Sequence, residues 1–190
     1  PEESLGYEFG VEQTWLGGMV HTGLTWFHTD FDDLITYDGI NNKYMNATKA
    51  KTEGFETYMD IGPWEWIKLS FSYTYVDPVY QTKEGDWKRR TYTPRNKVGG
   101  VVTLILPQNL TVSLRGIWVS ERIVPLYDPN FKTVNWKEPS YTTVDAALTY
   151  TFFKKHQLFL KVENLFDEDY TESGYGMPGR WVYGGFKAVF

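Results

Sequence analysis

The chain has 190 residues, of which 42% are hydrophobic and 18% aromatic, with no cysteine and a formal net charge of −5. No run of about 18 apolar residues could cross a membrane as a helix, and the acidic balance argues against nucleic acid as a partner. The lack of cysteine excludes disulfide bonds and thiolate metal sites.

Apolar and polar residues alternate along nearly the whole chain, and this period of two predicts β-strands with two different faces. The cleanest run, Ile67 to Tyr75, sets apolar and aromatic residues against lysine, serine and threonine. Nine strands are predicted in chain order, at about 7–12, 20–37, 54–61, 67–75, 98–106, 110–118, 143–152, 158–163 and 180–190.

Short and long connections alternate between these strands. Tight turns are expected at 16–18, 62–63, 107–109 and 154–156, and loops at about 38–42, 77–93, 124–139 and 166–179. Transmembrane barrels of the outer membrane have short periplasmic turns and longer extracellular loops. The pattern therefore favours such a barrel, with the last strand running toward the short-turn side.

One face of most strands is apolar, and the other carries ionisable residues. In a soluble sandwich the apolar faces would form a core, whereas in a barrel they would meet lipid and the charged faces would line a wet lumen. Alternation alone does not separate these two folds. The residues expected on the lumen wall of a barrel are Glu12, Glu56, Lys68, Arg115, Asp145, Lys161, Glu163 and Lys187.

Two further features favour the barrel. Aromatic residues gather near the short-turn ends, where a membrane interface selects them; they are Trp15, Trp64, Trp66, Tyr150, Phe152, Phe153 and Phe190. The final strand is not protected by charged residues or proline in the way that usually keeps a water-exposed edge strand from pairing with another chain. Its alternate positions are Val182, Gly184, Phe186, Ala188 and Phe190. Because bacterial barrels have an even number of strands, nine strands indicate a barrel segment whose earlier strands precede Pro1.

Several motifs resemble TonB-dependent outer-membrane receptors. The stretch VENLFDEDYTESGYGMPGRWVYGGFKAVF at 162–190 is similar to the carboxy-terminal signature of that family, including its Asn-Leu-Phe-Asp run and a Pro-Gly-Arg entry into the last strand. Further matches occur in the expected order: PEESLGYEFG at 1–10, WFHTDFDDLI at 26–35, Gly-Phe-Glu at 54–56, YTPRNKVG at 92–99 and SYTTVDAALTY at 140–150.

The resemblance implies an all-β, antiparallel transmembrane barrel of about 22 strands, plugged by an N-terminal domain. Residues 1–190 would be its C-terminal portion, with the plug, the TonB box and the earlier strands lying outside this sequence. The expected location is the outer membrane of a Gram-negative bacterium. The expected partners are outer-membrane lipid, the protein's own plug, TonB, and the barrel-assembly machinery through the terminal signature.

The implied function is energy-coupled uptake of a scarce ligand, such as a ferric siderophore, another metal chelate or cobalamin. No serine–histidine–acid group or spaced carboxylate pair indicates an enzyme, and no resident cofactor is expected. His21, His28 and His156 show no metal-ligand spacing. The alternatives are a passive outer-membrane channel and a soluble, aromatic-rich carbohydrate-binding sandwich.

Ligand capture is expected in the long loops. Clustered lysine and arginine concentrate an anionic chelate, and aromatic rings stack on planar ligand surfaces. The candidates are Trp87, Lys88, Arg89, Arg90, Tyr92, Tyr127, Phe131 and Trp136.

Overall fold

The computed structural model describes residues 1–38, 43–46, 49–82, 85–130 and 132–189. In this part of the chain the helical elements are two short 3-10 turns, η1 (Leu16–Gly18) and η2 (Pro107–Asn109). None of the described helices has the length and apolar character needed to cross a membrane.

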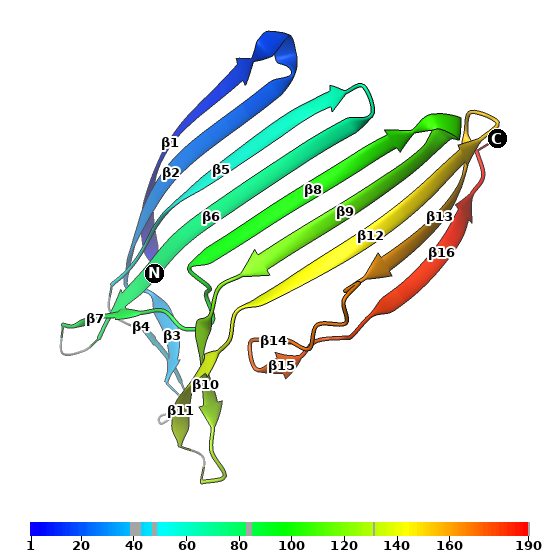
Figure 1. The fold of residues 1–190 in the computed structure, drawn as a ribbon. Coiled ribbons are helices and arrows are strands. Elements are labelled where there is room, and N and C mark those ends of the chain that lie inside the picture. The colour runs from blue at the N-terminus through cyan, green and yellow to red at the C-terminus, as the bar shows by residue number, and fades with distance from the viewer. Residues whose placement is uncertain (39–42, 47–48, 83–84, 131, 190) are drawn as a thin grey trace.

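One large antiparallel sheet dominates the fold (Figure 1). Its strands follow one another in chain order, so every neighbour is joined by a hairpin connection. The path consists of β1 (Glu3–Trp15), β2 (Val20–Asp32), β5 (Ala50–Trp64), β6 (Ile67–Gln81), β8 (Asn96–Leu106), β9 (Leu110–Val119), β12 (Tyr141–Phe152), β13 (His156–Glu163) and β16 (Trp181–Lys187). Each of these nine strands contains or overlaps one of the predicted strands.

The remaining strands are small and lie at the end of the sheet where the long connections are (Figure 1). Six of them form three separate two-stranded hairpins, and β7 pairs with the C-terminal end of β6. The hairpins are β3 (Ile35–Asp38) with β4 (Lys43–Asn46), β10 (Arg122–Tyr127) with β11 (Thr133–Glu138), and β14 (Thr171–Glu172) with β15 (Tyr175–Gly176); β7 is Trp87–Arg89.

The predicted strand at 20–37 was wrong at its C-terminal end. The structure ends β2 at Asp32, and Asp33 adopts a φ of 56°, a left-handed conformation that turns the chain out of the sheet. Residues 35–38 then pair with β4 in a different sheet. The turn predicted at 62–63 is also displaced: β5 continues to Trp64 after an irregularity in register, and the chain turns at Glu65.

The strand register gives the sheet two chemically different faces, because cross-strand partners point to the same side. One ladder runs through Asp60, Ser70, Val101, Arg115 and Asp145. The ladder beside it, on the opposite face, is apolar throughout and consists of Val20, Ile61, Leu69, Val102, Leu114, Ala146, Val162 and Val182.

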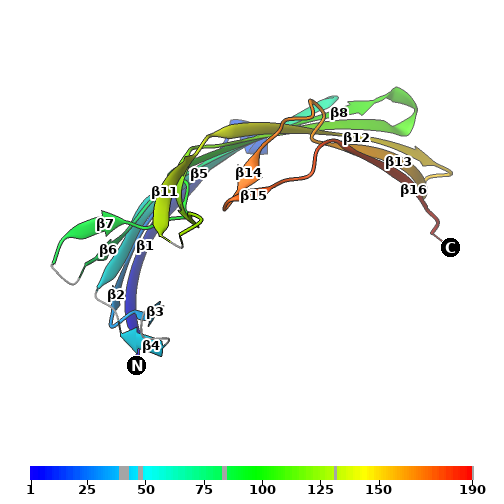
Figure 2. The same ribbon diagram turned by 90° about the horizontal axis from the view of Figure 1, so that it is seen from below.

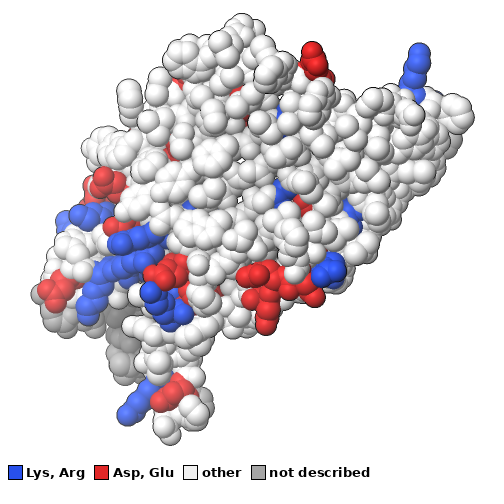
Figure 3. Space-filling model, viewed as in Figure 1, with Lys and Arg blue, Asp and Glu red and all other residues white. Residues whose placement is uncertain are grey.

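The sheet curves into an arch, with β1 and β16 at its two ends (Figure 2). Hairpin β14–β15 lies beneath the arch, and its segment contacts the polar side chains of β12, so the polar face is the concave one. The convex face carries an almost charge-free band (Figure 3). On β6 this band extends from Ile67 to Tyr75, roughly 26 Å of strand, which at a tilt of about 40° spans a height of about 20 Å, somewhat less than the apolar band of an outer-membrane barrel.

The sheet has no second layer packed on its apolar face. Among the described residues the buried hydrophobic ones are Ala50, Val119, Val124 and Tyr141, all near the long-loop end. Phe9, by contrast, is 72% exposed in the middle of β1. A soluble sandwich requires two sheets sharing a dry interior, so this architecture excludes the sandwich alternative.

Aromatic rings flank the apolar band at the short-turn end, as predicted. Trp15 donates its indole N–H to the hydroxyl of Thr22 at 3.0 Å, while Phe152 stacks on Phe186 with ring centroids 6.0 Å apart. Phe153 at the β12–β13 turn is 82% exposed. Phe190, which was also predicted to belong to this group, lies outside the described residues.

Two adjacent positions on β12 test the orientation of the sheet in a bilayer. Leu148 lies on the convex face and Thr149 on the concave face. In the full receptor, we expect Leu148→Lys to reduce the free energy of unfolding by about 2–4 kcal/mol, the cost of placing a charge in lipid. Thr149→Lys should be tolerated. Urea titration in lipid vesicles measures both, and equal losses would contradict the assignment of faces.

Candidate functional site

The concave face collects the ionisable side chains of the strands. The register places eight of them on this face, from seven strands of the main sheet. They are Glu12, Glu56, Lys68, Arg115, Asp145, Lys161, Glu163 and Lys187. All eight predicted wall residues therefore share one surface, and their part in transport stays a prediction.

These side chains are partly paired with one another. Lys161 Nζ lies 2.6 Å from Glu163 Oε1, and the Tyr183 hydroxyl donates to the same carboxylate at 3.1 Å. Arg115 and Asp145 are direct cross-strand partners, so opposite charges face each other on β9 and β12. Paired charges of this kind are compatible with a concave face that is exposed to water, because isolated charges are costly in an apolar medium.

Tyr58 covers Gly23 on the same face. A Cβ atom on Gly23 would lie 2.2 Å from the Tyr58 ring, so only glycine leaves room for the ring to lie flat on β2. The Tyr58 hydroxyl lies near the Glu12 carboxylate on β1. The contact links three neighbouring strands through their side chains in addition to the backbone ladder.

The Asn-Leu-Phe-Asp motif closes the loop after β13. Asn164 is buried, donates from Nδ2 to the Glu168 carbonyl at 2.9 Å and accepts the Glu168 N–H at 2.8 Å. Its own backbone N–H donates to Asp145 Oδ1 at 3.0 Å. Asp167 in turn accepts the Arg180 N–H at 2.7 Å, at the entry to β16. The motif therefore ties a long loop to the sheet on both sides.

A hollow opens on the concave face beside this loop. Its sheet side is formed by Thr143, Asp145 and Glu163, and its loop side by Tyr170 and Met177. Both acidic and aromatic groups line it, so the hollow offers hydrogen-bond acceptors next to a flat apolar surface.

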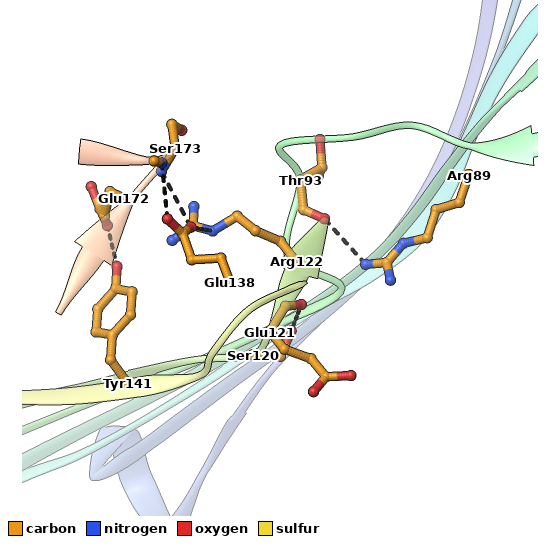
Figure 4. A network of polar contacts seen from close by, with 10 residues as sticks. Arg89, Thr93, Ser120, Glu121, Arg122, Glu138, Tyr141, Glu172 and Ser173 are labelled. Atoms are coloured by element: carbon orange, nitrogen blue, oxygen red, sulfur yellow. Dashed lines mark hydrogen bonds and ion pairs between the residues drawn. The ribbon is translucent and has the colours of Figure 1, made fainter. Parts of the chain in front are cut away.

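The buried carboxylate of Glu138 joins two of the small hairpins, because it pairs with Arg122 in its own hairpin and accepts hydrogen bonds from the other (Figure 4). Arg122 on β10 lies 2.6 Å from Glu138 on β11, and Glu138 is fully buried. The Glu138 carboxylate also accepts two hydrogen bonds from the β14–β15 hairpin, from the backbone N–H groups of Ser173 at 3.2 Å and Gly174 at 2.9 Å. This one carboxylate therefore connects the long loop that contains β10 and β11 to the long loop that contains β14 and β15.

Tyr141 extends the same network at the start of β12. Its hydroxyl donates to Glu172 on β14 (Figure 4). The centroid of its ring lies 4.3 Å from that of the Tyr170 ring. The Arg122 guanidinium sits 6.0 Å from the Tyr141 ring centroid. Burial, followed by the hydrogen bond to Glu172, raises the pKa of the Tyr141 phenol well above its ordinary value. The sequence patterns did not indicate this cluster, since its members are far apart in the chain.

The basic loop cluster is divided by the geometry of β7. Lys88 pairs with Tyr80, whereas Trp87 and Arg89 pair with Gln81 and Val79. Since neighbouring residues of a strand point to opposite faces, Trp87 and Arg89 lie on the convex side and Lys88 on the concave side. Arg90, whose N–H donates to the Pro78 carbonyl at 2.8 Å, follows Lys88 by two residues on that side.

The remaining loop candidates lie around the β10–β11 hairpin. The Tyr92 N–H donates to the Ile123 carbonyl at 2.8 Å, which draws the loop before β8 against β10. Tyr127 is 75% exposed near the hairpin tip, and Trp136 is half-buried opposite Val124. Phe131 lies outside the described residues. Among the described residues, no group of three or more histidine, aspartate or glutamate side chains is placed to hold a metal ion.

A family model described as "TonB dependent receptor-like, beta-barrel" matches residues 1–165 of the chain. Among curated proteins, the metal-pseudopaline receptor of Pseudomonas aeruginosa is 28% identical over 92% of this chain and 25% of its own length. The iron-regulated outer membrane virulence protein of Vibrio cholerae is 25% identical over 100% of this chain and 31% of its own length. The chain thus spans only a minor part of these relatives.

Solved structures show the same fold at lower identity. The FrpB iron transporter of Neisseria meningitidis superposes with a TM-score of 0.80 at 16% identity, covering 97% of this chain and 31% of that chain. The pyoverdine receptor FpvA of P. aeruginosa, bound to pyoverdine, gives a TM-score of 0.79 at 21% identity, covering 100% of this chain and 30% of its own.

The Glu138 carboxylate provides a test of the loop lock. Glu138→Ala leaves Arg122 charged and buried without its partner, a change that typically costs about 3–5 kcal/mol. Hydrogen exchange of the amides at 171–176 should then accelerate in the full protein, because Ser173 and Gly174 lose their acceptor.

A matched control is Glu121→Ala, which removes the exposed pair with Lys137 and should cost at most about 1 kcal/mol. If Glu138→Ala left the exchange of 171–176 unchanged, the two hairpins would be held by other contacts.

Proposed function

The chain belongs to the TonB-dependent receptor-like β-barrel family, and on that premise we propose that it is the C-terminal part of a receptor that imports a ferric siderophore or a similar metal chelate. The family consists of receptors, not enzymes, and the chain is an outer-membrane protein. We further propose that earlier strands complete a barrel of about 22 strands around an N-terminal plug.

The observation that carries the proposal is the chemical contrast between the two faces of a single sheet. The convex face presents aliphatic ladders that suit acyl chains, and the concave face presents charges that suit water. Import through a barrel needs a hydrated wall of this kind beside the plug. In this proposal, wall residues such as Arg115 and Asp145 pair with the plug and hold water along the path.

Capture of the ligand is assigned to the long-loop end. Lys88 and Arg90 supply positive charge on the concave side of β7, which attracts an anionic chelate. Tyr127 and Trp136 on the β10–β11 hairpin supply rings that stack on a planar ligand. The buried Arg122–Glu138 pair supports the proposal, because a preorganised loop loses less entropy on binding.

The choice of a metal chelate rests on what the relatives are named for. They include a metal-pseudopaline receptor and a ferripyoverdine receptor, and the ferripyoverdine receptor is 23% identical over 96% of this chain. We propose that energy for import comes from TonB acting on the plug. The alternating residues Val182, Gly184, Phe186, Ala188 and Phe190 are proposed as the signal that the barrel-assembly machinery recognises.

The basic pair on β7 provides one test of ligand capture. In the full receptor, we expect Lys88→Gln with Arg90→Gln to weaken binding of anionic ferric siderophores about tenfold, because two charge contacts are lost. Binding is measured by fluorescence quenching across a panel of chelates. The matched control, Lys154→Gln with Lys155→Gln, removes two charges at the opposite end of the sheet and should bind like the wild type. Equal affinities for both variants would remove these residues from the proposed site.

Energy coupling separates a receptor from a passive channel. We expect a strain that expresses this receptor alone to accumulate its radiolabelled chelate only when TonB is present. The measurement compares uptake in strains with and without TonB at the same receptor level. Undiminished uptake without TonB would favour the channel.

A further inference from the structure

The terminal strand β16 is joined to its neighbour by a loop that does not fix its position. β16 is seven residues long and lies at the edge of the sheet, where it pairs with β13 alone among the described strands (Figure 1). Residues 164–180 separate the two strands. A tight turn fixes which residues of a hairpin face each other, but a connection of this length leaves several registers open. The register of β16 therefore depends on contacts between the strands themselves.

The polarity of the two faces excludes only some of the alternative registers. A slip of β16 by one residue moves Phe186 to the concave face and Lys187 to the apolar one, because side chains alternate along a strand. A slip by two residues keeps every side chain on its own face. It brings Tyr183 or Lys187 opposite Phe159. In the observed register that place belongs to Gly185. A feature other than polarity is needed to exclude the two-residue slips.

The ring of Phe159 covers Gly185 on the concave face. A Cβ atom on Gly185 would lie 2.6 Å from Phe159 Cζ, a separation that real Cβ atoms essentially never show. The other concave positions of β16 all carry side chains; they are Trp181, Tyr183 and Lys187. Any of these side chains opposite Phe159 would have to occupy the space of its ring. The ring therefore fits over β16 in the observed register and not in one slipped by two residues.

His156 holds the end of the same strand on the convex face. Its ring centroid lies 5.5 Å from that of Phe152 on β12 and 6.3 Å from that of Phe186 on β16. Its Nδ1 accepts the Val189 N–H at 3.4 Å, beyond the last residue of β16 that pairs with β13. A slip by two residues moves Val189 about 7 Å along the strand and breaks this hydrogen bond. The imidazole thus supports the same register from the opposite face.

Covers of this kind occur elsewhere on the concave face, and their distribution is informative. Tyr58 covers Gly23, and the ring of Phe27 lies against Gly54. Both pairs join β2 to β5, two strands that are connected by a long loop, as β13 and β16 are. Among the described residues, the glycines covered by an aromatic ring are these two and Gly185. The covers therefore occur where no tight turn sets the register.

We propose that Phe159 is a positioning residue that sets the register of β16 through Gly185, with His156 as a second contact at the end of the strand. The register decides which backbone groups β16 presents at its outer edge, where none of the described strands pairs with it. In the barrel of the proposed function this edge closes the sheet on the first strand, so Phe159 also aligns the closing seam. The statement about the seam rests on the proposed function, whereas the register of β16 on β13 does not.

The test uses the full receptor with pairs of introduced cysteines, since residues 1–190 contain none. Val162→Cys with Val182→Cys reports the observed register, because these two residues face each other directly. Leu160→Cys with Val182→Cys reports a slip by two residues. In the observed register this second pair is diagonal, about 7 Å apart, which is too far for a disulfide. The purified receptor is oxidised with a membrane-permeant reagent, and mass spectrometry quantifies the disulfide-linked peptides.

Phe159→Ala should lower the cross-link of the observed register about twofold and raise that of the slipped register on the order of tenfold, because the overpacking that opposes the slip is removed. Phe159→Tyr keeps the ring and should retain the wild-type pattern. Tyr58→Ala is the matched control. It removes the same kind of cover from Gly23, between two other strands, and should leave both cross-links of β16 unchanged.

Gly185→Ala keeps the proposal testable if Phe159→Ala does not assemble, as judged by its heat-modifiable electrophoretic mobility. The added Cβ displaces the ring, so the cross-link of the observed register should fall in this variant as well. Unchanged cross-links in the Phe159 and Gly185 variants would overturn the proposal, as would an equal change in Tyr58→Ala. Failure of the wild-type receptor to take up a chelate would count against the proposed function and leave the register result intact.

Discussion

The structure depends on one constraint: each strand between β1 and β16 forms its backbone hydrogen bonds with two neighbouring strands of one sheet, and none of the described residues forms a layer over the apolar face. The ladder continues from β1 to β16 through strands that are all neighbours in the chain. Lipid offers no hydrogen bonds, so only a sheet paired in this way can expose aliphatic ladders to acyl chains. The large exposed residues, such as Phe9 and Phe71, are therefore expected consequences of the environment and not defects of packing.

The buried chemistry of the molecule is concentrated at the long-loop end. There, the Arg122–Glu138 ion pair, the ring contact of Tyr141 with Tyr170 and the hydrogen bonds of Asn164 hold the chain together in place of a hydrophobic core. A buried ion pair is weak support for overall stability, but it specifies one arrangement strongly, because breaking it leaves a charge without a partner. The long loops are thus held in one arrangement by polar contacts, whereas the strands of the wall are held by backbone pairing.

The alternation within β7 shows how geometry divides a sequence motif. Trp87, Lys88, Arg89 and Arg90 are consecutive in the chain and read as one basic cluster. Pairing with β6 sends alternate members to opposite sides, one toward the interior and one toward the membrane border. A single charged run is therefore divided between two faces, and only Lys88 and Arg90 belong to the proposed ligand-capture site.

The sequence by itself determined the existence of the nine main strands, the turns at 16–18 and 107–109 and the face of each wall residue, because side chains of a strand alternate with a fixed period of two. Lys68 and Arg115 could be assigned to one surface for that reason alone. Only the tertiary structure decided where β2 leaves the sheet at Asp33, how the hairpins form inside the long loops, and that Glu138 meets Ser173 and Gly174. These features join residues far apart in sequence, and no local periodicity encodes such contacts.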